Sequence, residues 1–220
     1  MMPASEWLVR VSETLASEYP DCFDKLVSYL IETIRNNPKA LGSFIMRKNN
    51  NPDWVMEAIN APVGKIADAL MKDQRKDNLI AGKGFPIEWI KHWDALFNLL
   101  DDLSCHALTI AAYNLRWFFH NDPGWTQEKL LSKLEHKGKQ KDAIWCGFLW
   151  VGKTPSLTLY NRLKSDLHSL IVESSLGRRG YRENLAALVL EGWGVVGREE
   201  GKPAISNKEM REILLDADGK

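Results

Sequence analysis

The sequence of 220 residues has little cysteine, no long apolar run and no net charge. Its 29 basic residues equal its 29 acidic residues, which argues against a dedicated nucleic-acid binder, because such proteins normally carry a strongly basic domain. No apolar stretch reaches the roughly 18 residues that a membrane-spanning helix requires. The N-terminus shows no basic start followed by an apolar core, so we expect no secretory signal peptide.

Residues that bind metals or form disulfides are equally sparse. The three cysteines are Cys22, Cys105 and Cys146, and their spacing matches no zinc or redox pattern. The five histidines contain no H-x-x-x-H or H-E-x-x-H pair, which are the spacings typical of zinc sites on helices. We therefore expect no metal, no cofactor and a chain that resides in the cytoplasm.

Apolar residues at helical spacing are abundant, and hydrophobic residues make up 45% of the chain. The nine tryptophans indicate large aromatic contacts in a core. Apolar positions that recur every three or four residues predict about nine to eleven helices and no strand ladder. We predict helices over residues 4–18, 20–35, 39–47, 54–71 (interrupted at Pro62), 86–101 (beginning at Pro86), 104–119, 127–136, 140–151, 157–174, 181–191 and 207–217.

Local signals predict where several of these helices begin. Asp53, Ser104 and Thr126 are each placed to cap a helix N-terminus, and Ser206 with Glu209 forms a capping box. The strongest turn signal is the Asn-Asp-Pro-Gly sequence at 121–124. In the first helix, the spacing places Trp7, Leu8, Val11 and Leu15 on the inward face.

The sequence therefore predicts an all-α protein, either an irregular bundle or an α-solenoid of stacked antiparallel helical hairpins. We expect one helical body over residues 1–220, with a weak boundary in the polar loop at 73–85. No repeat of fixed length is visible, so no named repeat class is indicated.

One catalytic motif occurs, because residues 147–154 match the P-loop pattern G-x-x-x-x-G-K-[ST]. In a P-loop, backbone amides between Gly147 and Gly152 would surround phosphates, Lys153 would contact the outer phosphates and Thr154 would bind magnesium. We reject this interpretation, because the residues between the glycines are bulky, the preceding segment is too charged for a buried strand, and Pro155 disfavours helical geometry at Thr154. The segment is interpreted as a helix that ends at Gly152.

Two clusters of basic residues are candidate contact surfaces for a partner. If they come together in the fold, they could bind phosphates or an acidic protein, whereas the plainer interpretation is a solvated surface. The first cluster contains Lys129, Lys133, Lys137, Lys139 and Lys141, and the second contains Arg178, Arg179 and Arg182.

Three segments, 54–70, 115–164 and 205–218, carry a resemblance when taken in this order. They include Ala58-Ile59-Asn60-Ala61-Pro62-Val63-Gly64-Lys65, Leu115-Arg116-Trp117-Phe118-Phe119, Asp122-Pro123-Gly124-Trp125-Thr126, Trp145-Cys146-Gly147-Phe148-Leu149-Trp150 and Leu214-Leu215-Asp216-Ala217-Asp218. The order resembles the helical region of unknown function found C-terminal to sirtuin-like domains in large bacterial proteins, some linked to anti-phage defence. The resemblance implies that NAD hydrolysis or deacylation belongs to the sirtuin-like domain, and that this chain is part of a longer protein.

We therefore expect a non-catalytic scaffold or sensor module that acts through protein–protein contact or self-assembly. Grooves between stacked helices suit such contacts. The alternatives are a nucleotide-binding protein that uses residues 147–154 and a helical domain that contacts nucleic acid through the basic clusters.

Overall fold

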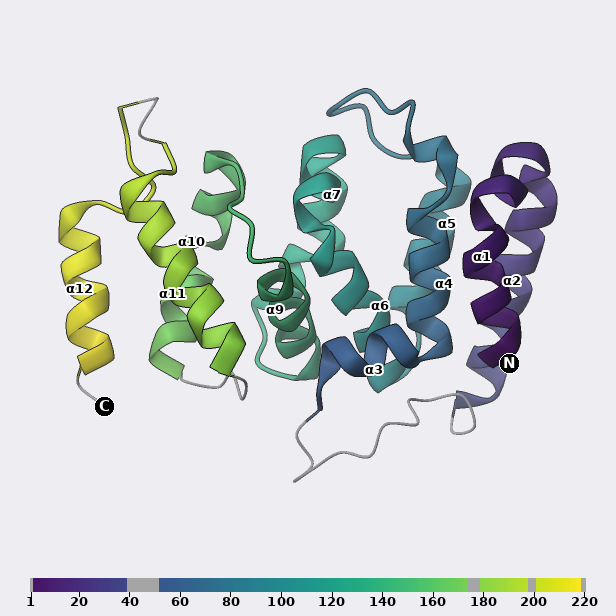
Figure 1. Cartoon of the computed structure of the whole chain (residues 1–220), viewed down its shortest axis with the longest axis horizontal. Coiled ribbons are helices and arrows are strands. Elements are labelled where there is room, and N and C mark those ends of the chain that lie inside the picture. The colour runs from purple at the N-terminus through teal and green to yellow at the C-terminus, as the bar shows by residue number, and fades with distance from the viewer. Residues whose placement is uncertain (1, 39–51, 174–178, 198–200, 219–220) are drawn as a thin grey trace. The chain divides into compact units, whose positions relative to one another are not determined.

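The protein is all-α, as the sequence predicts. The computed structural model describes residues 2–38, 52–173, 179–197 and 201–218, and this part of the chain contains twelve α-helices and no strand (Figure 1). The helix predicted over 39–47 lies outside the described residues. The α-helices are α1 (Met2–Glu18), α2 (Pro20–Asn36), α3 (Trp54–Asn60), α4 (Pro62–Met71), α5 (Ile87–Phe97), α6 (Asp102–Tyr113), α7 (Leu115–Asn121), α8 (Pro123–Lys129), α9 (Lys139–Val151), α10 (Leu157–Glu173), α11 (Arg179–Gly194) and α12 (Asn207–Asp218).

The chain divides into two compact units, Met1–Phe148 and Leu149–Lys220. The polar segment at 73–85 lies inside the first unit and contains a short 3-10 helix, Gln74–Lys76. A second 3-10 helix, Leu131–Leu134, follows α8. No helix in the described ranges has both the length and the apolar character needed to cross a membrane.

An aromatic cluster forms much of the core of the first unit, which confirms the core role predicted for tryptophan. Phe118 lies at its centre, with its ring centroid 5.2 Å from that of Trp93 and 5.5 Å from that of Trp125. Trp89 is buried beside them and donates a hydrogen bond from its indole nitrogen to the Leu70 carbonyl at 3.0 Å. This bond satisfies one indole N–H inside the core and joins α5 to the end of α4.

The buried face of the first helix overlaps only in part with the predicted one: Leu8 is buried as predicted, Val11 and Leu15 are half-buried, and Trp7 is exposed. The buried positions of this helix are Ser5, Leu8, Ser12 and Ala16, whereas the side chain of Trp7 is 52% exposed. Small residues allow α1 to pack closely against α4, so the size of the side chains, and not only their hydrophobicity, decides which face turns inward.

Two predicted caps are wrong, and one predicted break between helices is present but shorter than expected. Ser104 lies inside α6, where its hydroxyl donates to the Asp101 carbonyl at 2.9 Å. Thr126 is buried within α8, and the cap of that helix is Asp122, which accepts a hydrogen bond from the Trp125 amide at 2.8 Å. The turn expected at 121–124 is therefore confined to Asp122, because proline is well suited to the first position of a helix.

Other helix ends also differ from prediction. Pro86 lies just before α5, and not at its first position. The helix predicted over 104–119 is two helices separated at Asn114, whose side-chain amide donates to the Ile110 carbonyl at 2.9 Å and satisfies an open carbonyl at the end of α6. The Asp53 cap and the break between α3 and α4 at Ala61 are confirmed.

The second unit contains α10, α11 and α12, in which α10 contacts both of the other helices (Figure 1). The Tyr160 hydroxyl donates to the Leu188 carbonyl at 3.0 Å and anchors α10 on α11. A Cβ at Gly192 would lie only 2.1 Å from that hydroxyl, so glycine is required where the tyrosine ring crosses α11. The predicted capping box is confirmed, because Glu209 accepts from the Ser206 amide at 2.8 Å and Ser206 accepts from the Glu209 amide at 3.2 Å.

Candidate functional site

The P-loop-like segment is helical for most of its length. α9 includes residues 147–151 and ends before Gly152, which has a φ of 58°; the predicted helix and its glycine end are confirmed. A Cβ at Gly147 would lie 2.1 Å from the Thr109 carbonyl oxygen, so this glycine serves the close approach of α9 to α6. Thr154 has its hydroxyl against the Glu191 carboxylate. These contacts give structural roles to residues that a P-loop would use for phosphate and magnesium.

Four lysines of the first basic cluster line one hollow in the first unit. This hollow has a volume of about 660 Å³, and we call it the basic hollow. Lys133, Lys137, Lys139 and Lys141 contribute to its wall. Lys129 is the exception, because its ammonium group pairs with Asp94 at 3.4 Å and Glu128 at 3.1 Å.

Only one side chain of the second basic cluster lies in the described part of the chain. Arg178 lies outside the described residues, and so does the side chain of Arg179. Arg182 lines a different cavity, in the second unit.

That cavity is an apolar groove of about 410 Å³ among α10, α11 and α12. Nine of its ten lining residues are Leu170, Ile171, Leu185, Ala186, Val189, Leu190, Met210, Ile213 and Leu214, and the tenth is Arg182. We call it the apolar groove. Leu190 is 53% exposed, Leu214 57% and the neighbouring Leu215 67%, so large aliphatic side chains also project around the groove. Contiguous exposed apolar surface of this kind marks interaction sites more often than isolated exposed leucines do.

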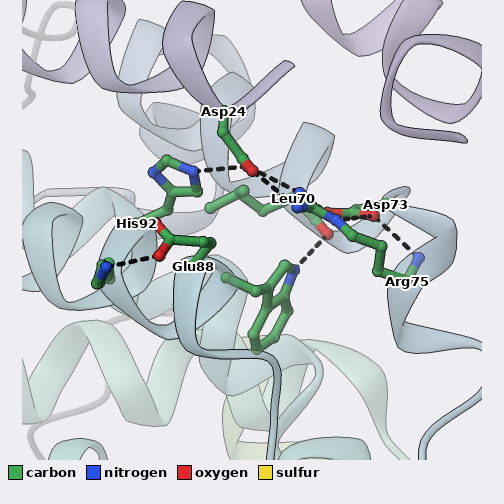
Figure 2. Close-up of polar contacts among 8 residues, drawn as sticks. Asp24, Leu70, Asp73, Arg75, Glu88 and His92 are labelled. Carbon is green, nitrogen blue, oxygen red and sulfur yellow. Dashed lines mark hydrogen bonds and ion pairs between the residues drawn. The ribbon is translucent and has the colours of Figure 1, made fainter. Parts of the chain in front are cut away.

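A polar cluster in the first unit joins three parts of the chain that are distant in sequence (Figure 2). Arg75 donates to both oxygens of Asp24, each at 2.8 Å, and its Nε donates to Asp73 at 2.8 and 3.0 Å. His92 on α5 lies with its Nε2 2.9 Å from Asp24. Burial acts to raise the pKa of Asp24, but its hydrogen bonds with Arg75 and His92 outweigh this and hold the pKa below its ordinary value.

This polar cluster stabilises the packing of its helices and is poorly suited to catalysis. The guanidinium of Arg75 pairs with Asp24 and with the fully buried Asp73, and a paired carboxylate of lowered pKa, such as Asp24, is a poor general base near neutral pH. No group of three or more His, Cys, Asp or Glu side chains in the described regions is placed to hold a metal ion. Sequence reasoning missed the cluster, since its members lie on separate elements and share no motif.

A second buried pair consists of Glu57 on α3 and His106 on α6. Their side chains are fully buried, with His106 Nε2 3.5 Å from a Glu57 carboxylate oxygen, and the Trp54 ring lies edge-on to the imidazole at 6.2 Å. Besides the basic hollow and the apolar groove, the described residues form a more polar cavity of about 370 Å³ in the second unit, whose wall includes Tyr160, Lys164 and Glu209.

Comparison with known proteins gave no relative: no family model, no curated protein and no solved structure matches this chain.

Proposed function

We propose that this chain is a non-catalytic helical scaffold or sensor module that acts through protein–protein contact, and that the apolar groove is its contact surface. The single observation that carries the proposal is the groove itself, which has nine apolar lining residues and one charged one. Exposed leucines stand around it. Grooves of this kind between helices accept the apolar face of another helix.

The occupant we assign is α12 of a second copy of the chain. The groove and the projecting Leu214 and Leu215 belong to one surface, so a two-fold interface would place the leucines of each copy in the groove of the other. A net charge of zero weakens repulsion between copies.

Sedimentation equilibrium of the purified chain over a wide range of concentration tests this proposal. We expect a monomer–dimer equilibrium that Leu190→Lys and Leu214→Lys each weaken at least about tenfold, since burying one unpaired charge costs more than about 1.4 kcal/mol. Tyr29→Lys is the matched control, because Tyr29 is 68% exposed on α2 in the first unit. A chain that stays monomeric at every concentration, or a dimer that both groove variants leave intact, would overturn the assignment.

The context of a sirtuin-like defence protein rests on the resemblance alone, and we propose it on that basis. It assigns NAD hydrolysis or deacylation to a different domain. The chain by itself is therefore expected to release no nicotinamide from NAD, and measured turnover would contradict a non-catalytic role.

A further inference from the structure

The basic hollow is built from the N-termini of two long helices in the first unit. α6 contributes Ser104 and α9 contributes Lys139, Gln140 and Lys141. The two helix ends adjoin, because Lys139 pairs with Asp102 at 2.8 Å and the Gln140 side chain lies 3.4 Å from the Ser104 hydroxyl. The first amides of a helix have no acceptor within that helix, and the macrodipole places positive potential there. Two such ends facing one hollow favour an anion.

Lys141 provides an independent indication of a ligand. This residue is only 8% exposed, yet it lines the hollow and makes no ion pair or hydrogen bond with any described residue. Its ammonium group is open to solvent. The stem of Lys141 is therefore held in place by packing while its ammonium group stays open to solvent, and an anion in the hollow would supply the missing counter-ion.

The side chains that line the hollow carry a net positive charge, like the helix N-termini beside it. Its wall carries four lysines, Lys133, Lys137, Lys139 and Lys141, against two carboxylates, Asp101 and Glu135. Asp102, which pairs with Lys139, offsets a third lysine, so the four lysines exceed the three carboxylates by one positive charge. The Ser104 and Ser132 hydroxyls at this wall donate to the Asp101 and Glu128 carbonyls, so the lysines are the side chains that would contact an anion.

We propose that the basic hollow binds the phosphate groups of a small molecule. A volume of about 660 Å³ is within the range of small-molecule pockets. An extended polyanion such as DNA needs a basic stripe along an open surface, whereas here Lys141 is only 8% exposed. The proposed site is separate from residues 147–154 and does not depend on them, nor on the apolar groove.

Isothermal titration of the full chain with orthophosphate, pyrophosphate and a nucleoside diphosphate at about 0.15 M salt tests the proposal. We expect saturable binding of pyrophosphate that Lys141→Met weakens at least tenfold and Lys133→Met weakens several-fold. Methionine keeps the length and apolar stem of the lysine. Lys153→Met, in the P-loop-like segment, is the matched control and should bind as tightly as the wild type.

The three ligands distinguish the source of the phosphate. Tighter binding of the nucleoside diphosphate than of pyrophosphate would show that the hollow also holds the nucleoside. Equal affinity for the two ligands would show that the hollow contacts the phosphates alone. Circular dichroism verifies that each variant is folded. If Lys141→Met does not fold, Lys133→Met alone tests the site. Absence of saturable binding of all three anions would overturn the proposal. The proposal would also be overturned if Lys153→Met abolished pyrophosphate binding while Lys133→Met and Lys141→Met left it unchanged. Binding of a DNA duplex without binding of pyrophosphate would overturn it as well.

Discussion

Gly147 on α9 and Thr109 on α6 approach so closely that a Cβ on the glycine would lie 2.1 Å from the threonine carbonyl oxygen. The Thr109 hydroxyl also lies 3.3 Å from the Ala143 carbonyl, one turn earlier on α9. The first glycine of the P-loop-like motif is therefore a packing residue between two helices.

Gly147→Ala is expected to destabilise the protein by at least about 2 kcal/mol, because the added methyl group meets backbone that cannot move aside cheaply. Thermal denaturation should show a fall in Tm of about 4–8 °C. Gly194→Ala is the control, since no atom lies within 4 Å of a Cβ there, and its effect should stay within about 0.5 kcal/mol. An unchanged Tm for Gly147→Ala would contradict the packing role.

Arg75 holds the fully buried carboxylate of Asp73 together with Asp24. Arg75→Met should lower the free energy of unfolding by about 3–5 kcal/mol, because it leaves a buried charge without a partner. Arg75→Lys should cost less, since it restores the charge but not the planar fork. Urea denaturation at neutral pH measures both.

The matched control for this prediction is Arg35→Met, which removes an exposed ion pair with Glu32. Exposed pairs contribute little, so its cost should be within about 1 kcal/mol. Equal effects of the Arg35 and Arg75 variants would show that the cluster does not tie the helices together.

Glu209 links α12 to α10 through Lys164, whose ammonium group lies 2.5 Å from its carboxylate. This hydrogen bond, together with the one from the Ser206 amide, lowers the pKa of Glu209 to about 2. Because the pKa in the folded chain is below its ordinary value of 4.5, the stabilisation is present above pH 4.5 and is lost as the pH falls toward 2.

Lys164→Met should raise the pKa of Glu209 toward 4.5, and NMR titration of the glutamate side chain measures the shift. The Ser206 amide remains, so the pKa should stay somewhat below that value. Lys208→Met is the comparison variant, because Lys208 pairs with Glu212 and not with Glu209. A Glu209 pKa that is the same in the wild type and in Lys164→Met would refute the assigned cause.

Asp101 precedes α6 with a φ of 50° and a ψ of −130°, a conformation that glycine adopts far more readily than aspartate. Asp101→Gly should therefore stabilise the protein by about 1 kcal/mol, once the strain relieved is set against the greater flexibility of glycine. It should also tighten pyrophosphate binding, since it removes a negative charge from the basic hollow.

Chemical denaturation and titration calorimetry measure these two effects separately. Asp102→Gly, one residue along, should instead destabilise, because Asp102 is helical and pairs with Lys139. If Asp101→Gly lowered the free energy of unfolding, the Asp101 carboxylate would have to make a contact that stabilises the fold by more than the backbone strain destabilises it.

The sequence by itself determined the helical class, most helix positions and the local caps at Asp53 and Ser206. These depend on apolar spacing and on hydrogen bonds within about four residues, which a single segment encodes. The helix over the P-loop-like segment was predictable for the same reason, because the bulky residues between its glycines suit a packed helix better than a phosphate loop.

Only the tertiary structure decided which surfaces came together. The inward face of α1, the cluster around Arg75 and the gathering of four lysines with the N-termini of α6 and α9 all join residues from different helices. Spacing along one helix defines its apolar stripe, but the size of the neighbouring side chains and the path of the other helices decide what that stripe meets. The buried position of Lys141 follows from that packing, and the proposed anion site follows from it in turn.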